Sequence, residues 1–191
     1  RKIAVLFTGR INDPVLAEEL IKEGFCDLVG MVRAGIADPE FANKAREGRL
    51  GEIRRCIGCT RCIDEASAPA TMPYTPTCSI NPVIGNELRW QQQYRPAQEP
   101  KRVVVVGGGI AGCEAARVAA MRGHRVILLE QGKRLGGQLL IAARAPGRDS
   151  FEDQAYFEEN EMARLGVEVR LQSCADVAAI RALSPDAVAI A

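Results

Sequence analysis

The sequence predicts an α/β protein with parallel β-sheets. Short apolar runs alternate with stretches of helical length in residues 1–50 and again in residues 101–191. This order is typical of parallel strands joined by right-handed helical crossovers. The intervening residues 51–100 hold six of the ten prolines, so we expect little regular structure there and some support other than a hydrophobic core.

The two strand–helix units expected in residues 1–50 follow from apolar runs and helix-end signals. The run Ile3–Phe7 is apolar without a break, as expected for a strand buried on both faces. Asn12 or Asp13 can cap the helix that follows, Pro14 suits its first position, and Gly24 ends it. The second strand–helix unit consists of a strand at 26–31 and a helix that begins at Asp38-Pro39 and ends near Gly48.

Residues 101–191 predict a second set of alternating strands and helices. Glycines at 123 and 166 mark two helix ends, and Ser150 suits a helix cap. We interpret residues 91–100, which precede this set, as a linker. The expected strands are 102–106, 125–129, 167–171 and 187–190, and the expected helices are 110–122, 150–165 and 175–183.

Size and charge exclude several classes of protein. A chain of 191 residues has room for two small domains but not for a complete barrel of about 250 residues. Charged residues make up 26% and hydrophobic residues 47%, which is a soluble globular composition. A net charge of +1 indicates binding to neither nucleic acid nor an acidic membrane surface. No apolar run approaches the roughly 20 residues of a membrane span, and we expect a cytoplasmic protein.

The two ends of the chain also carry information. There is no initiator methionine, and apolar runs typical of strands stand at 3–7 and at 187–191. Because a natural domain seldom begins and ends inside such strands, we expect a piece of a longer polypeptide.

Four of the seven cysteines gather in the proline-rich segment. Cys56, Cys59 and Cys62 form a C-x₂-C-x₂-C triplet, and 15 residues separate Cys62 from Cys78. Three thiolates at two-residue gaps can bind three corners of a cubane while a distant fourth completes the ligand set. Zinc usually takes two separated pairs of cysteines, so the pattern favours a [4Fe–4S] cluster over a structural zinc ion. We interpret Cys26, Cys113 and Cys174 as small buried hydrophobic residues.

A dinucleotide-binding fingerprint follows the expected strand 102–106. Gly107, Gly109 and Gly112 form a G-x-G-x-x-G motif before a helix. Gly107 allows a tight turn, Gly109 lets the backbone approach a pyrophosphate, and Gly112 lets helix and strand pack closely. The N-terminus of the helix then offers a partial positive charge to the phosphates.

Further residues support an adenine-dinucleotide site. Glu130 ends the next strand, 23 positions after Gly107, where a carboxylate can accept from both ribose hydroxyls and would disfavour the 2′-phosphate of NADP. His124, the only histidine, is interpreted as a surface residue, so no Ser–His or Cys–His catalytic machinery is predicted. The expected cofactor contacts are Gly107, Gly109, Ile110, Ala111, Gly112, Glu130, Gln131, Gly137 and Gln138.

The cysteine spacing, the fingerprint and their order together resemble one family, the iron–sulfur flavoenzymes that include 2,4-dienoyl-CoA reductase and trimethylamine dehydrogenase. The resemblance covers essentially the whole chain. It implies an FMN-binding TIM barrel like that of old yellow enzyme, then a [4Fe–4S] segment, then a domain similar to FAD/NAD-dependent reductases. Residues 1–50 would be the last two strand–helix units of the barrel, 51–100 the iron–sulfur segment and linker, and 101–191 an incomplete Rossmann-like domain for FAD or ADP.

The resemblance also implies a partly present FMN site. Backbone N–H groups near Gly9, Arg10 and Val32, together with the Arg33 guanidinium, would hold the FMN phosphate, because barrel enzymes often bind phosphate at the loops after strands seven and eight. Without the resemblance, Arg10 and Arg33 would be interpreted as solvated loop residues.

The activity implied by the resemblance is an electron relay. FMN exchanges a hydride equivalent with an enoyl/enone-type or amine substrate, and the cluster carries single electrons between FMN and the second nucleotide. In the reductase branch NAD(P)H supplies electrons through FAD. In the amine-dehydrogenase branch ADP takes that place, and electrons leave to an electron-transfer flavoprotein.

The sequence has features of both branches. The C-x₂-C-x₂-C spacing resembles the amine dehydrogenases, whereas Glu130 and the loop at Gly136-Gly137 resemble an FAD site. The gap before Cys78 is longer than expected for either branch. The catalytic residues are unassigned, because those facing the substrate would lie on earlier barrel loops. The residues alone leave open a non-catalytic electron-transfer or nucleotide-binding module and a zinc-stapled NAD-binding protein.

Overall fold

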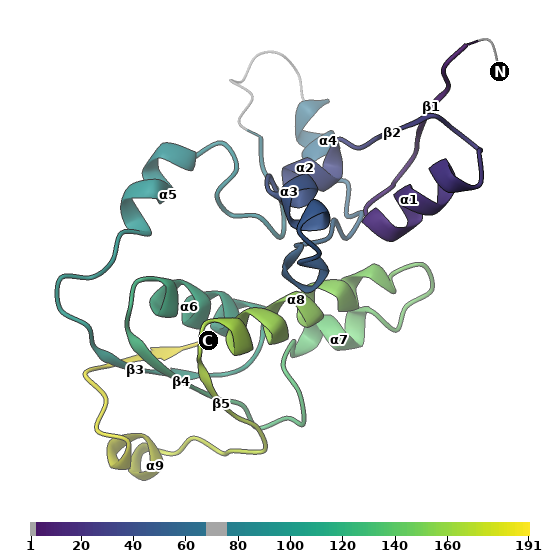
Figure 1. Ribbon diagram of the computed structural model, residues 1–191. Helices are drawn as coiled ribbons and strands as arrows, with labels where there is room; N and C mark the ends of the chain where they lie inside the picture. Colours follow the sequence, from purple (N-terminus) through teal and green to yellow (C-terminus); the bar gives the residue numbers. More distant parts are fainter. Residues whose placement is uncertain (1–2, 68–75) are drawn as a thin grey trace. The chain divides into compact units, whose positions relative to one another are not determined.

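The computed structural model describes residues 3–67 and 76–191, and the chain divides into two compact units, residues 1–86 and 87–191 (Figure 1). Each unit is of the α/β type with parallel strands, which confirms the predicted fold class. The division falls inside the segment 51–100 that the sequence analysis treats as one piece.

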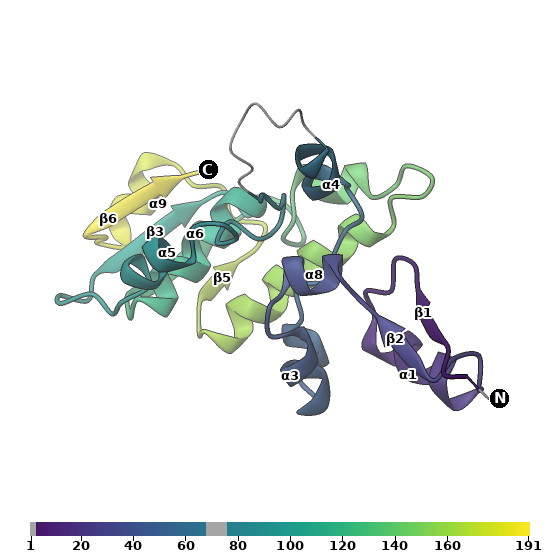
Figure 2. The ribbon, with the colours of Figure 1, turned by 90° about the horizontal axis from the view of Figure 1, so that it is seen from above.

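The first unit begins with a β–α–β arrangement. Strands β1 and β2 pair in parallel, with Leu6 opposite Leu28, and α1 lies beside them (Figure 2). Helices follow, and the last of them carries Cys62. The elements are β1 (Leu6–Thr8), α1 (Pro14–Lys22), β2 (Leu28–Gly30), α2 (Arg33–Ala37), α3 (Phe41–Arg46), the 3₁₀ helix η1 (Leu50–Glu52) and α4 (Arg61–Ala66).

Local signals in the sequence account for helix α1. The Asp13 side chain accepts from the Val15 N–H at 3.0 Å, Pro14 occupies the first turn, and Gly24 adopts a positive φ of 74° just beyond the end. These contacts satisfy backbone groups that the helix itself leaves unpaired. Of the two predicted caps, the structure therefore uses Asp13.

The strand at 3–7 was expected to be buried on both faces, and that expectation is wrong for this chain. Strand β1 starts only at Leu6, and the side chains of Leu6 and Leu28 are 59% and 55% exposed. The reason is that, in the part of the chain that the structure describes, β1 and β2 pair only with each other. A two-stranded sheet with one helix leaves most of its apolar surface uncovered.

The segment 51–100 contains more regular structure than predicted. Helix α4 forms within the cysteine segment, and α5 (Glu87–Gln93) overlaps the stretch 91–100 that was interpreted as a linker. Helix α5 continues into a turn in which the Tyr94 N–H donates to the Trp90 carbonyl at 2.8 Å, and the two rings pack 5.3 Å apart. Short helices of this kind depend on such local contacts more than on composition.

The second unit is a four-stranded parallel sheet with the order β5-β4-β3-β6. This is the 3-2-1-4 order of the doubly wound nucleotide-binding folds. Three of its helices lie close to the predicted spans, whereas the short helix α7 was not predicted. The remaining elements are β3 (Arg102–Val106), α6 (Ile110–Met121), β4 (Arg125–Leu129), α7 (Gln138–Ala142), α8 (Ser150–Arg164), β5 (Glu168–Arg170), α9 (Val177–Ala182) and β6 (Ala187–Ile190).

The core of the second unit lies on both faces of its sheet. On one face Val105 and Leu128 pack with Cys113 of α6 and Met162 of α8. On the other face Val104 and Ile127 pack with residues in and around α9, among them Ile180 (Figure 1). None of the helices in the described parts of the chain combines the length and the apolar character needed to cross a lipid bilayer.

Helix α6 packs closely on the residue that follows β3. A Cβ on Gly112 would stand 1.9 Å from the Gly107 carbonyl oxygen, so only glycine fits. Gly107 itself has a φ of 105°, which turns the chain sharply from strand to helix.

We predict that Gly112→Ala lowers the free energy of unfolding of the second unit by about 3 kcal/mol, because the new methyl group must push apart a helix and a strand. Urea unfolding monitored by hydrogen exchange of residues 102–129 measures this change. Gly109→Ala is the control, because Gly109 precedes the same helix with a φ of −68° and has open space around it, so the free energy of unfolding should change by no more than about 0.5 kcal/mol. Equal stability of the two variants would contradict the packing argument.

Candidate functional site

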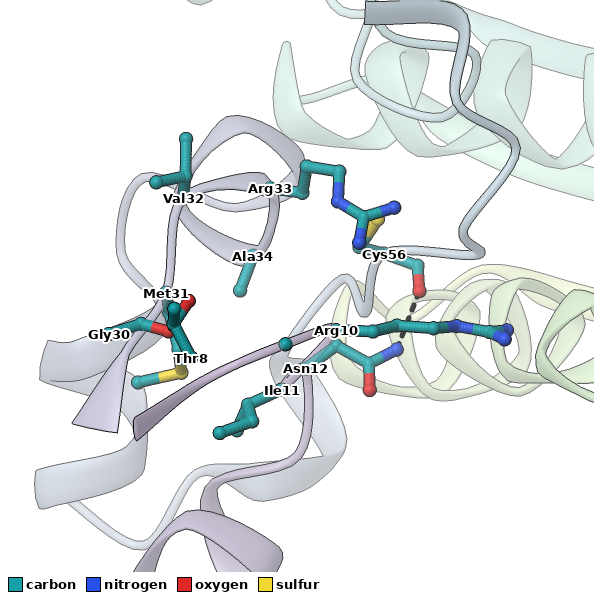
Figure 3. Close-up of a pocket in the computed structure, with 11 residues that line it drawn as sticks. Thr8, Arg10, Ile11, Asn12, Gly30, Met31, Val32, Arg33, Ala34 and Cys56 are labelled. Carbon is teal, nitrogen blue, oxygen red and sulfur yellow. Dashed lines mark hydrogen bonds between the residues drawn. The ribbon is translucent and has the colours of Figure 1, made fainter. Parts of the chain in front are cut away.

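A pocket of about 150 Å³ opens at the carboxyl ends of β1 and β2 (Figure 3). It brings together all four residues that the family resemblance assigned to FMN phosphate: Gly9, Arg10, Val32 and Arg33. Gly9 and Arg10 follow β1, and Val32 and Arg33 lead into α2. Cys56, a predicted cluster ligand, also lines this pocket, and so do Thr8, Ile11, Asn12, Gly30, Met31 and Ala34, for which no phosphate role was predicted.

The four clustered cysteines line a second pocket in the same unit. Cys56, Cys59, Cys62 and Cys78 all contribute to its wall, as the spacing predicted that they would lie together. Much of the remaining wall is apolar and includes Ile36, Ile57 and Ile80. None of the seven cysteines forms a disulfide, so all four thiols are available as ligands.

The cysteine loop is folded so that backbone groups face its own sulfur atoms. The Gly58 N–H donates to the Cys56 Sγ over 3.4 Å, and Gly58 has a φ of 68°, which favours glycine. The Asn12 side chain donates to the Cys56 carbonyl at 2.6 Å and ties the loop to the end of β1. On the other side of the pocket, the Cys59 Sγ and the Ser79 Oγ are 3.3 Å apart, next to Cys78.

The buried carboxylate of Asp38 fixes the residues that lead into this loop. Asp38, only 5% exposed, accepts from the Arg54 N–H at 2.9 Å and from the Lys44 ammonium at 2.7 Å. The Arg54 guanidinium is also buried and donates to the Ile80 carbonyl at 2.5 Å. One polar network therefore holds the residues before Cys56 and those after Cys78.

The pKa of Cys62 reflects its burial and the closeness of the other three cysteines. Burial raises the pKa of the Cys62 thiol above its usual value, and the three other cysteines raise it further, so the four sulfurs interact electrostatically. Among residues 3–67 and 76–191, no group of three or more His, Cys, Asp or Glu side chains is arranged to hold a metal ion. Four thiols on one pocket are the donor set of either an iron–sulfur cluster or a zinc ion.

The glycine motif of the second unit has the local geometry that the sequence suggested. Gly109 precedes the 12-residue helix α6, and a Cβ at Gly109 would meet nothing within 4 Å. A ligand can therefore approach this backbone closely, at the positive end of the helix dipole. Ile110, Ala111 and Gly112 form the first turn of α6.

Glu130 lies beside this motif at the end of β4. Its two carboxylate oxygens accept from the Gly108 N–H at 2.6 Å and from the Gly132 N–H at 2.5 Å. A cavity of about 270 Å³ opens here, outside the carboxyl ends of the strands, where doubly wound folds bind nucleotides. Gly107, Glu130 and Gln131 line it together with Val106, Leu129, Ser173, Cys174, Ala175 and Ala191.

The remaining predicted contacts lie next to the cavity but do not line it. Gly136 pairs with Gly109 as an isolated β-bridge, and its N–H donates to the Gly108 carbonyl at 2.8 Å. Gly137 is exposed beside Gly109, and Gln138 is the exposed first residue of α7. The loop thus packs on the glycine motif.

The other cysteines and His124 are placed as follows. Cys26 and Cys113 are buried, as expected, and burial with nearby carboxylates raises the pKa of Cys113 to about 12. The expectation for Cys174 is wrong, because its side chain is exposed and lines the Glu130 cavity. Its position after β5 could have indicated this, since loops at the carboxyl ends of parallel strands surround the ligand crevice. His124 is partly exposed and accepts from the Lys101 N–H at 3.1 Å.

Comparisons with known proteins point to flavin-dependent oxidoreductases. Residues 102–172 match the family described as FAD dependent oxidoreductase. The chain is 45% identical to an NADH oxidase of Thermoanaerobacter brockii and 41% identical to an N,N-dimethylglycine/sarcosine dehydrogenase of Chromohalobacter salexigens, with 99% of the chain covered in both cases. The structure of a 2-naphthoyl-CoA reductase matches the whole chain with a TM-score of 0.89 and 33% identity.

The chain is shorter than these relatives. It spans 29% of the NADH oxidase, 27% of the dehydrogenase and 28% of the reductase.

We predict that Glu130→Ala weakens the binding of an adenine nucleotide by about 1–3 kcal/mol, the usual scale for the loss of charged hydrogen bonds. Isothermal titration of the protein with ADP after removal of bound nucleotide measures this. An unchanged affinity would remove Glu130 from the site.

Because Glu130 also holds the Gly108 and Gly132 amides, a second variant separates ligand contact from loop support. Gly109→Ala adds a methyl group in open space, so it should leave the thermal unfolding temperature unchanged while it weakens ADP binding. Normal ADP affinity in this variant would show that the phosphates do not approach Gly109.

Proposed function

Since the chain belongs to the iron–sulfur flavoenzyme family of 2,4-dienoyl-CoA reductase and trimethylamine dehydrogenase, we propose that it is part of an oxidoreductase that passes electrons between FMN, a [4Fe–4S] cluster and an adenine nucleotide. Flavins exchange hydride equivalents with organic molecules, and iron–sulfur clusters carry single electrons. The residues of this chain would bind these groups and set the path between them.

The observation that carries this proposal is that two neighbouring pockets share two of their lining residues. Arg33 and Cys56 line both the pocket at the ends of β1 and β2 and the pocket of the four cysteines. In Figure 3 the Arg33 side chain extends toward Cys56. A flavin whose phosphate lies in the first pocket and a cluster bound by Cys56 would therefore occupy adjoining sites.

The proposed FMN site uses the backbone N–H groups near Gly9, Arg10 and Val32 and the Arg33 guanidinium.

Strands β1 and β2 expose apolar side chains, which include Leu6, Phe7 and Leu28. We propose that these two strands are part of a TIM barrel whose other strands cover them in the whole protein.

The proposed cluster ligands are Cys56, Cys59, Cys62 and Cys78. Positively charged iron would relieve the repulsion between the thiolates, and the apolar wall would keep water away from the sulfur atoms. The Gly58 N–H directed at the Cys56 Sγ is the kind of hydrogen bond that adjusts the potential of such a centre.

The proposed adenine-nucleotide site uses the N-terminus of α6, the Glu130 carboxylate and the adjoining loops, with FAD or ADP as occupant.

The proposals for the substrate and the electron partner rest on the names of the relatives. Their names include dehydrogenases of methylated amines, a cinnamate reductase and a 2-naphthoyl-CoA reductase. For the whole protein we propose an amine or an enoyl-type substrate, and NAD(P)H or an electron-transfer flavoprotein as partner, in the cytoplasm.

We predict that Cys59→Ser in the complete polypeptide abolishes the cluster and uncouples the two nucleotide sites. Iron and sulfide per chain should fall strongly, and electrons supplied at one site should no longer reach the flavin at the other in anaerobic stopped-flow experiments. Cys26→Ala is the control, because Cys26 is buried away from the cysteine pocket and should keep its iron. Full iron and sulfide in Cys59→Ser would exclude Cys59 as a ligand.

A further inference from the structure

The backbone of Arg10 is assigned to the phosphate pocket, but its side chain ends at the cysteine loop. Arg10 follows β1 in a left-handed conformation with a φ of 51°, and it lines the phosphate pocket. Its guanidinium, however, lies against Gly58 of the cysteine loop. A Cβ built on Gly58 would stand 3.0 Å from the Arg10 Nε, 3.1 Å from its Nη2 and 3.2 Å from its Cζ.

Gly58 connects the Arg10 guanidinium to a sulfur atom, because it contacts both of them. It lies between Cys56 and Cys59, and its N–H donates to the Cys56 Sγ. The guanidinium thus packs on the peptide whose dipole is directed at a proposed ligand. Because Gly58 has no side chain, nothing separates the charge from this backbone.

Several other arginines lie near the loop, and one of them, Arg33, lines the cysteine pocket itself. Arg55 faces the Asp13 carboxylate at 3.2 Å, and Arg61 faces Glu65 at 3.1 Å. Arg54 is buried in the network of Asp38 and the Ile80 carbonyl. The Arg10 guanidinium lies against Gly58, within the cysteine triplet.

We propose that Arg10 is a positioning residue with two functions: its backbone contributes to the phosphate pocket, and its guanidinium raises the reduction potential of the cluster held by the adjoining loop. A cubane with four thiolate ligands becomes more negative by one charge when it takes up one electron. A nearby fixed cation stabilises that more negative form. This inference rests on the proposed function.

The experiment is a redox titration of the anaerobically purified, complete protein with dithionite and mediators, monitored by the EPR signal of the reduced cluster. In Arg10→Gln the equilibrium constant for reduction should fall about tenfold, which corresponds to a shift of 59 mV to lower potential. Arg10→Lys, which keeps the charge, should restore most of the wild-type potential. Iron and sulfide should remain at wild-type levels, because the cysteine ligands are unchanged.

Arg46→Gln is the control for general charge effects, since Arg46 is an exposed arginine outside both pockets and its removal should leave the potential unchanged. An unchanged potential in Arg10→Gln with a full cluster would overturn this inference and leave the proposed function standing. Loss of iron from Arg10→Gln would also overturn it, because Arg10 would then support the loop rather than adjust the potential. A wild-type protein without any cluster signal would overturn the proposed function and this inference together.

Discussion

The buried carboxylate of Asp38 is the interaction on which the cysteine pocket depends. It binds the Arg54 backbone and the Lys44 ammonium, and the Arg54 side chain extends the network to the Ile80 carbonyl. The apolar cluster beside it is small, with Phe41 and Ile53 among its few members. A segment with so small a core needs polar contacts to fix its shape, and charged groups at these depths are stable only when each has a partner.

The same network explains how a proline-rich segment can present four sulfur atoms on one pocket. Cys56 and Cys78 lie far apart in sequence, yet each is two residues from a member of the Arg54–Ile80 contact. The Asn12 amide adds a link from the Cys56 carbonyl to the end of β1, which is also a wall of the phosphate pocket. The strand ends and the cysteine loop are therefore held by one set of contacts, and this set makes neighbours of the two proposed cofactors.

The sequence predicted the elements that have a strong signal of their own. Strands β3 and β4 follow from long apolar runs, and α6 follows from its glycine motif. Helices α2 and α7 were missed because each has only five residues and forms through tertiary contacts. The cysteine spacing and the Gly107 motif indicated two sites, since their chemistry requires fixed intervals. Asp38 and Arg54 belong to no motif, and their role arises only when folding buries them together.

The measurement that tests this account most directly is the content of iron, acid-labile sulfide and zinc in the protein purified without oxygen. The C-x₂-C-x₂-C triplet and Cys78, which line one pocket, lead us to expect about four iron and four sulfide per chain, and no zinc. One zinc ion without sulfide would contradict the account. Cys56, Cys59, Cys62 and Cys78 would then form a structural site, and the electron path between the two nucleotides would have no carrier.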